Sequence, residues 1–134
     1  MIYLTREQII SINKDMILSF GGSYYEGISN IKNDNSFGYI LSAPDQKVFG
    51  VERYPSILNK AAAYLFFIIK DHIFCDGNKR TGMVAAFTFL DLNGMEISRK
   101  VNWNRIVNYA ERIAGCKPTI KHISQWLKRI SNIQ

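Results

Sequence analysis

Two long apolar segments with a short polar loop between them constrain the fold of this chain more than any other sequence feature. Residues 55–71 are apolar almost all round, and residues 78–92 carry apolar side chains at helical spacing. Pro55 can open the first helix because the first turn does not need its missing donor, and Asn93-Gly94 stops the second. The pattern predicts two core helices and therefore an all-α helical bundle.

Three further helices are predicted around this pair. Thr5 to Gln8 forms a capping-box pattern that opens a helix over residues 5–20, before Gly21-Gly22. A second covers Trp103 to Ala114 and is expected to stop at Gly115, and a third runs from near Thr119 to about Ile130. The 134 residues carry no internal repeat or linker, so residues 1–134 are expected to form a single domain.

The stretch from Gly21 to about Tyr54 lacks a sustained period and is rich in Gly, Ser, Asn and Tyr. A short helical turn is predicted around Ser36 to Leu41. Val48 to Val51 favours a short strand, half of a hairpin whose partner lies upstream. The fold class is thus all-α with a small irregular or β-hairpin flap between the first and second main helices. Long irregular segments are usually functional, although an ordinary surface loop is the alternative.

Composition narrows the function classes. The net charge of +6 permits nucleic-acid binding. No recognition helix stands out, however, and most basic residues are scattered, so nucleic acid is not expected as a partner. The scattered residues are Lys14, Lys32, Lys47, Arg99, Lys100, Lys117, Lys121, Lys128 and Arg129. The most apolar run, Ala61 to Ile69, is too short to span a membrane. Two cysteines without metal-ligand spacing indicate a cytoplasmic protein.

The loop between the core helices carries the chemistry. The second helix begins near Gly77, and a helix N-terminus exposes unpaired N–H groups that attract anions. Lys79 and Arg80 add two cations suited to phosphate oxygens. A lone carboxylate such as Asp76 beside phosphates is the usual way to hold Mg²⁺. His72 precedes the loop and is the side chain best suited to accept a proton near neutral pH.

Each of these residues has an ordinary explanation when it is taken alone. A histidine at a helix end is commonly structural, Asp-Gly-Asn is a common turn, and Lys-Arg at a helix start is commonly solvated. Their joint occurrence within nine residues weakens those explanations. Phosphoryl or nucleotidyl transfer needs a base, a metal ligand and a phosphate site together.

The string His72-x-Phe74-x-Asp76-Gly77-Asn78-Lys79-Arg80 resembles the signature of the Fic/Doc family. With Lys after the Asn, it resembles the Doc branch, the toxins of toxin–antitoxin modules. Gly21-Gly22, Tyr54-Pro55 and Leu92-Asn93-Gly94 are similar to Doc-type proteins as well.

The resemblance implies a set of roles. Fic-fold proteins transfer part of a nucleoside triphosphate, here ATP, to a hydroxyl side chain of a target protein. By resemblance, His72 would be the base, Asp76 would bind Mg²⁺ and Phe74 would anchor the loop. The phosphates would be held by Gly77, Asn78, Lys79 and Arg80. A hairpin flap that aligns the target would consist of Gln46, Lys47, Val48, Phe49, Gly50 and Val51.

Two departures from the family pattern bear on whether the chain transfers phosphate or AMP. Relatives that transfer AMP have Gly at the position of Lys79 and a second Arg at the position of Met83. In the Doc branch, similar changes accompany a reversed nucleotide and transfer of the γ-phosphate. The resemblance therefore implies a Mg²⁺-dependent protein kinase that blocks translation, with elongation factor Tu as the expected target. AMP transfer is the alternative, and a non-catalytic binding module is a remote one.

The resemblance also bears on control of the activity. Many Fic proteins carry a built-in brake helix in which a Ser or Thr is followed, after three residues, by Glu. The string from Ser23 to Gly27 has only two residues in between, so it is interpreted as a chance near miss. A missing brake fits a toxin restrained by a separate small antitoxin protein.

Overall fold

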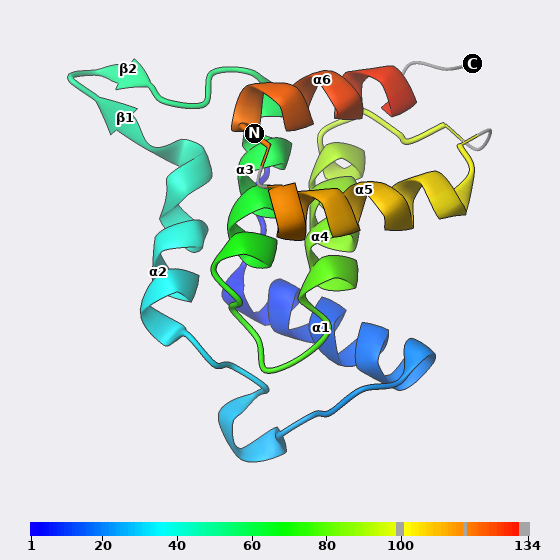
Figure 1. Cartoon of the computed structure of the whole chain (residues 1–134). Helices are drawn as coiled ribbons and strands as arrows, with labels where there is room; N and C mark the ends of the chain where they lie inside the picture. The colour runs from blue at the N-terminus through cyan, green and yellow to red at the C-terminus, as the bar shows by residue number, and fades with distance from the viewer. Residues whose placement is uncertain (99–100, 117, 132–134) are drawn as a thin grey trace.

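The computed structural model describes residues 1–98, 101–116 and 118–131 of the chain; Arg99, Lys100 and Lys117 lie outside them. These residues form a mainly α fold with one small hairpin (Figure 1), which confirms the predicted fold class. The elements are α1 (Arg6–Phe20), η1 (Glu26–Ile28), α2 (Asp34–Ser42), η2 (Ala43–Asp45), β1 (Lys47–Val48), β2 (Val51–Glu52), α3 (Ile57–Lys70), α4 (Asn78–Leu92), α5 (Trp103–Cys116) and α6 (Ile120–Ser131).

The predicted pair of apolar helices forms the centre of the molecule. Figure 1 shows α3 and α4 side by side, with α1 and α5 packed on α4 and α6 packed on α3. Tyr64 and Phe89 are fully buried where α3 faces α4, with ring centroids 5.2 Å apart. Burying such a side chain stabilises the fold by about 1.5–3 kcal/mol. No helix in the described part of the chain is long and apolar enough to cross a membrane.

The first helix begins and ends where the sequence predicts. The Thr5 hydroxyl accepts a hydrogen bond from the Gln8 N–H, and the Gln8 side chain accepts one from the Thr5 N–H, which completes the capping box. Gly21 follows α1 at φ +92°, a left-handed backbone conformation that favours glycine.

Two predicted helix boundaries are wrong. Pro55 precedes α3 rather than opening it, because Ser56 is the N-cap and its hydroxyl accepts from the Asn59 N–H at 3.0 Å. Gly115 does not stop α5, which continues to Cys116. A glycine inside a helix costs only about 1 kcal/mol relative to alanine, and the apolar stripe of α5 is already buried before that point.

The strand predicted at Val48 to Val51 is also wrong, because this segment is a hairpin in itself. Lys47 pairs with Glu52 and Val48 with Val51 in antiparallel register. Phe49 and Gly50 form the two-residue turn with φ of +51° and +78°, the signs required by a type I′ hairpin turn. No upstream partner strand is needed.

A buried cation holds the base of this hairpin. Lys60, in the second turn of α3, is 1% exposed. Its ammonium donates to the Pro44 carbonyl at 2.8 Å and to the Glu52 carboxylate at 3.2 Å. Since a buried charge requires such partners, Lys60 fixes the hairpin to the N-terminal part of α3.

Candidate active site

The residues predicted to carry chemistry meet in one surface hollow of about 370 Å³ at the C-terminal end of α3 and the start of α4. We call it the motif hollow. Its lining consists of Ile69, His72, Cys75, Asp76, Gly77, Asn78, Lys79, Arg80, Glu111 and Ala114. It thus contains the proposed base, the proposed metal ligand and all four proposed phosphate ligands.

The loop that shapes the hollow is anchored in the core. Phe74 is fully buried and packs edge-on against Phe37 of α2, with ring centroids 5.5 Å apart. Ile73 beside it is fully buried as well. The two aromatic rings bind the loop to α2 and leave the polar residues on either side facing the hollow.

Asn78 closes the loop from the other side. Its side-chain amide donates to the Phe74 carbonyl and its side-chain oxygen accepts from the Phe74 N–H, both at 2.9 Å. The side chain predicted to hold phosphate is therefore occupied in shaping the loop. The backbone N–H of Asn78, at the first position of α4, is the part of this residue left for an anion.

Asp76 is exposed and held in one orientation by backbone donors. Its two carboxylate oxygens accept from the Ser23 N–H at 2.9 Å and from the Gly77 N–H at 2.8 Å. The backbone approaches closely here, since a Cβ on Gly22 would lie 2.8 Å from one of these oxygens. Among the described residues, no three His, Cys, Asp or Glu side chains gather into a metal site. A cation at Asp76 would therefore need phosphate and water oxygens as its other ligands.

His72 occupies a tight turn directly after α3. It has φ +47°, an uncommon conformation for a residue with a side chain. The Asn33 amide stabilises the turn by donating to the carbonyls of Asp71 and His72, at 2.8 and 3.0 Å. The imidazole is exposed, lines the hollow and makes no hydrogen bond to any residue that the structure describes.

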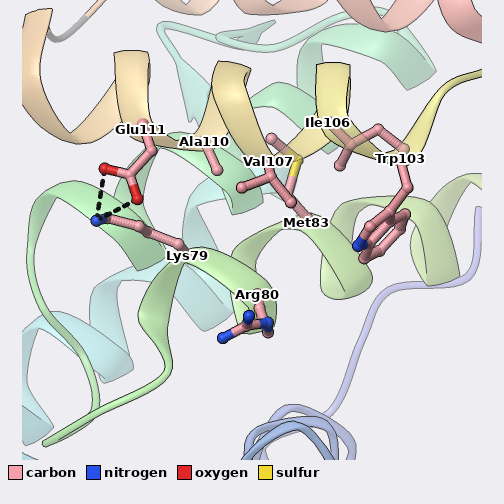
Figure 2. A pocket seen from close by; sticks show the side chains of 8 residues that line it. All are labelled: Lys79, Arg80, Met83, Trp103, Ile106, Val107, Ala110 and Glu111. Atoms are coloured by element: carbon pink, nitrogen blue, oxygen red, sulfur yellow. Dashed lines mark hydrogen bonds and ion pairs between the residues drawn. The ribbon is translucent and has the colours of Figure 1, made fainter. Parts of the chain in front are cut away.

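The two cations of α4 differ in their surroundings. The Lys79 ammonium lies 2.9 Å from each carboxylate oxygen of Glu111 on α5 (Figure 2). The Arg80 guanidinium stacks over the Phe20 ring, 4.6 Å from its centroid. Lys79 is thus already in an ion pair. Among the residues that the structure describes, Arg80 contacts an aromatic face, and no hydrogen bond uses its donors.

A buried amide network supports the loop from beneath. Asn13 of α1 donates to the Asp76 carbonyl at 2.9 Å and to the Thr81 hydroxyl at 3.0 Å, and it accepts from Asn30 at 2.9 Å. The Asn30 carbonyl in turn accepts from the Cys75 N–H at 2.8 Å. Asn13, Asn30 and Thr81 are fully buried. Satisfied networks of this kind rigidify a site.

The arm between α1 and α2 forms the outer support. Ile31 makes an isolated antiparallel bridge with Phe74, and the Ile73 carbonyl accepts from the N–H groups of Lys32 and Asn33 at 2.8 and 3.1 Å. The segment shows no helical period in the sequence because its backbone runs along the motif loop and pairs with it.

The hairpin predicted to align a target does not lie at the hollow. Figure 1 shows β1 and β2 projecting from the end of the bundle opposite to the motif loop. Lys60 fixes them near the start of α3, whereas His72 follows its end. The prediction for Gln46 to Val51 relied on position along the chain alone. A role of this hairpin in aligning a target stays a prediction.

Comparisons with known proteins show the family of the chain. The family model described as Fic/DOC family matches residues 3–90, and the chain belongs to that family. A curated relative, Toxin Doc of Mycolicibacterium smegmatis (strain ATCC 700084 / mc(2)155), is 30% identical over 112 residues, which cover 84% of this chain and 80% of the relative. The family match ends inside α4, so Glu111 lies beyond it.

Sequence reasoning missed several residues that shape the site. Asn13 and Asn30 lie far from the motif in sequence and have no motif of their own. In the sequence Glu111 is an ordinary surface position of a helix, and nothing there indicates that it pairs with Lys79. In the sequence Gly22 indicates only a helix stop, whereas in the structure its missing Cβ also makes room for Asp76.

Proposed function

We propose that this protein is a Doc-type toxin that acts as a protein kinase and transfers the γ-phosphate of ATP to a hydroxyl side chain of a target protein. The observation that carries the proposal is the meeting of His72 and Asp76 with Lys79 and Arg80 at the α4 N-terminus in one hollow. The relative named Toxin Doc supports the toxin role. Fic/Doc proteins are transferases of phosphate or AMP, so the reaction class follows from the family.

The residues of the hollow have the chemistry that the reaction needs. An imidazole nitrogen of His72 takes the proton of the target hydroxyl while the hydroxyl oxygen attacks the γ-phosphorus of ATP. The new oxygen–phosphorus bond forms while the bond from the γ-phosphorus to the β–γ bridging oxygen breaks, and ADP leaves with that electron pair. Lys79, Arg80 and the free N–H groups of α4 stabilise the charge on the phosphate oxygens.

Asp76 suits a divalent cation shared with the phosphates. Its carboxylate is exposed, is pre-oriented by two N–H donors and lies next to the α4 N-terminus. Mg²⁺ is commonly held by one or two carboxylates together with substrate phosphates. When bound, the ion would neutralise charge on the phosphates, and Asp76 is the described side chain that would hold it.

Transfer of labelled ATP tests the proposal. Purified protein is incubated with Mg²⁺, elongation factor Tu as the expected target, and ATP labelled at either the γ- or the α-phosphate. Label from the γ-position should appear on the target, and His72→Ala should abolish it without lowering the melting temperature, because the side chain is exposed. Transfer of α-label would instead show an AMP transferase, and no transfer to any protein of a cell extract would favour a non-catalytic module.

The toxin role has a separate test in cells. We propose that the protein arrests growth by blocking translation and that a small antitoxin protein restrains it. Expression of the wild type should arrest growth, whereas His72→Ala should not. Arrest that persists in the His72→Ala variant at equal protein level would contradict a catalytic toxin.

A further inference from the structure

A hollow of about 280 Å³ is formed by residues of α5 and α6, and we call it the α5–α6 hollow. Each side chain that lines it carries an N–H or O–H donor, and none carries a negative charge. The lining consists of Arg105, Asn108, Tyr109, Arg112, Trp126 and Arg129. None of these residues lines the motif hollow, and all of them lie beyond residue 90, where the family match ends. The family match therefore says nothing about this hollow.

Helical spacing gathers the lining residues of α5 on one side of that helix. Arg105, Tyr109 and Arg112 lie four and three residues apart, so their side chains follow one another along the same face. A pair of stacked rings joins this face to α6, since Tyr109 and buried Trp126 have centroids 4.1 Å apart and an interplanar angle of 8°. Arg129 comes three residues after Trp126 and supplies the third guanidinium group from α6.

The three arginines of the hollow have no carboxylate partner among the residues that the structure describes. The ion pairs found between those residues use other cations, those of Arg6, Lys14, Lys60 and Lys79. Glu111 is the only acidic residue in the sequences of α5 and α6, and it pairs with Lys79 at the motif hollow. The α5–α6 hollow thus gathers three positive charges that no acidic side chain there offsets, and an anion would relieve their mutual repulsion.

Tyr109 adds a neutral donor between the charges. Burial raises the pKa of its hydroxyl from 10.0, while the positive charges of Arg112 and Arg129 act in the opposite direction. The effect of these two charges also means that both guanidinium groups lie near the phenol oxygen. The hydroxyl therefore stays protonated near neutral pH and can donate to an anion together with the arginines.

A ligand for this hollow must be compact and carry more than one negative charge. A single carboxylate would leave two of the arginines unpaired, whereas a phosphate on a side chain carries about −1.5 to −2 charge at pH 7 and offers three strong acceptor oxygens. Guanidinium groups bind such oxygens in pairs. We propose that the α5–α6 hollow is an anion site for a phosphate-bearing ligand, whose phosphate belongs to a free diphosphate or to a phosphorylated side chain of another protein. The proposal goes beyond the proposed function and does not depend on transfer at His72.

Tryptophan fluorescence can report on this hollow alone. The chain has two tryptophans, so Trp103→Phe leaves only Trp126, which lines the hollow and stacks on Tyr109. This variant is the parent protein for the test and is titrated with inorganic pyrophosphate without added Mg²⁺. The Trp126 emission should change and reach saturation. Titrations without any saturable change, with pyrophosphate and with the phosphopeptide described below, would overturn the proposal.

Single charge removals separate a built site from general attraction. Arg112→Gln in the parent protein should weaken pyrophosphate binding about tenfold, since a hydrogen bond between charged groups is lost. Lys128→Gln removes the same charge from α6 at an exposed position that does not line the hollow, and it should leave the binding unchanged. Both replaced side chains are exposed, so the melting temperatures should equal that of the parent. Unchanged binding in Arg112→Gln, or equal weakening in both variants, would overturn the proposal.

Two peptides distinguish the sources of the phosphate. One is a short neutral peptide with a single phosphoserine, and the other carries two glutamates in place of the phosphoserine. Tighter binding of the phosphopeptide than of pyrophosphate, lost in Arg112→Gln, would assign the hollow to a phosphorylated side chain, and the reverse order would assign it to a free diphosphate. Equal affinity for the phosphopeptide and the glutamate peptide would overturn the assignment to phosphate.

Discussion

Glu111→Gln should strengthen ATP binding, because it releases Lys79 for the phosphates. In the structure the Lys79 ammonium lies 2.9 Å from both Glu111 oxygens, so phosphate oxygens must compete with a carboxylate for the same donor. Both side chains are about half exposed, and such pairs are worth about 0–1 kcal/mol. Removing the pair and its negative charge should therefore lower the dissociation constant of ATP about fivefold, which corresponds to about 1 kcal/mol.

Calorimetric titration at two salt concentrations measures this effect. The gain should shrink as salt rises, since the Debye length falls from about 10 Å at 0.1 M to about 3 Å at 1 M. Asp34→Asn is the matched control, because Asp34 forms an ion pair with Arg6 at 2.8 Å with similar exposure and does not line the hollow. It should leave the ATP affinity unchanged.

Two results would refute the reasoning. Weaker ATP binding in Glu111→Gln would mean that the carboxylate holds Lys79 in the orientation that phosphate needs. Unchanged binding in Glu111→Gln together with unchanged binding in Lys79→Met would mean that Lys79 is no phosphate ligand.

Three further predictions follow from the surroundings of the hollow. Asn13→Ala should lower the free energy of unfolding in urea by about 2–4 kcal/mol, because it leaves the buried Asn30 and Thr81 side chains and the Asp76 carbonyl without this partner; a loss below about 1 kcal/mol would mean that water replaces the amide. Gly22→Ala should raise the Mg²⁺ concentration required for transfer, since its Cβ would meet Asp76 at 2.8 Å, whereas Gly21→Ala has a similarly positive φ but open space around it; equal Mg²⁺ requirements would contradict this. Burial raises the pKa of Tyr64 from 10.0 to about 12, so the folded state holds this proton more tightly and stability should fall by up to about 2–3 kcal/mol between pH 10 and 12. Alkaline unfolding should show this loss, and Tyr64→Phe should reduce it.

The helices α1, α3, α4, α5 and α6 could be predicted because each carries its own signal, whereas the sequence indicated only a short turn, around Ser36 to Leu41, where α2 lies. The capping box at Thr5 and the apolar residues of α3 and α4 are local patterns, and local patterns set local structure. The errors at Pro55 and Gly115 are errors of boundary, where caps and packing decide between neighbouring residues. The hairpin could not be predicted from alternation, because its strands of two residues are too short to show any.

The candidate site was predictable only along the motif. Spacing within residues 72–80 was enough to group the chemical residues, because a short loop keeps them close whatever the fold. Asn13, Asn30 and Glu111 act across the tertiary structure, and single polar residues give no pattern that reveals a distant partner. The same limit explains why Asn78 was given a phosphate role although its side chain turns back to Phe74.

The buried amides beneath the loop make the loop part of the cooperative folding unit. Asn13 belongs to α1, Asn30 to the arm and Thr81 to α4, so the Cys75 backbone cannot leave its place unless these elements separate. The backbone amide of Cys75 should therefore exchange its hydrogen only when the whole molecule unfolds, unlike the amides of an exposed binding loop. If Cys75 exchanges in this way, the motif loop stays formed in the native molecule, and control of the site is expected to act by covering the motif hollow.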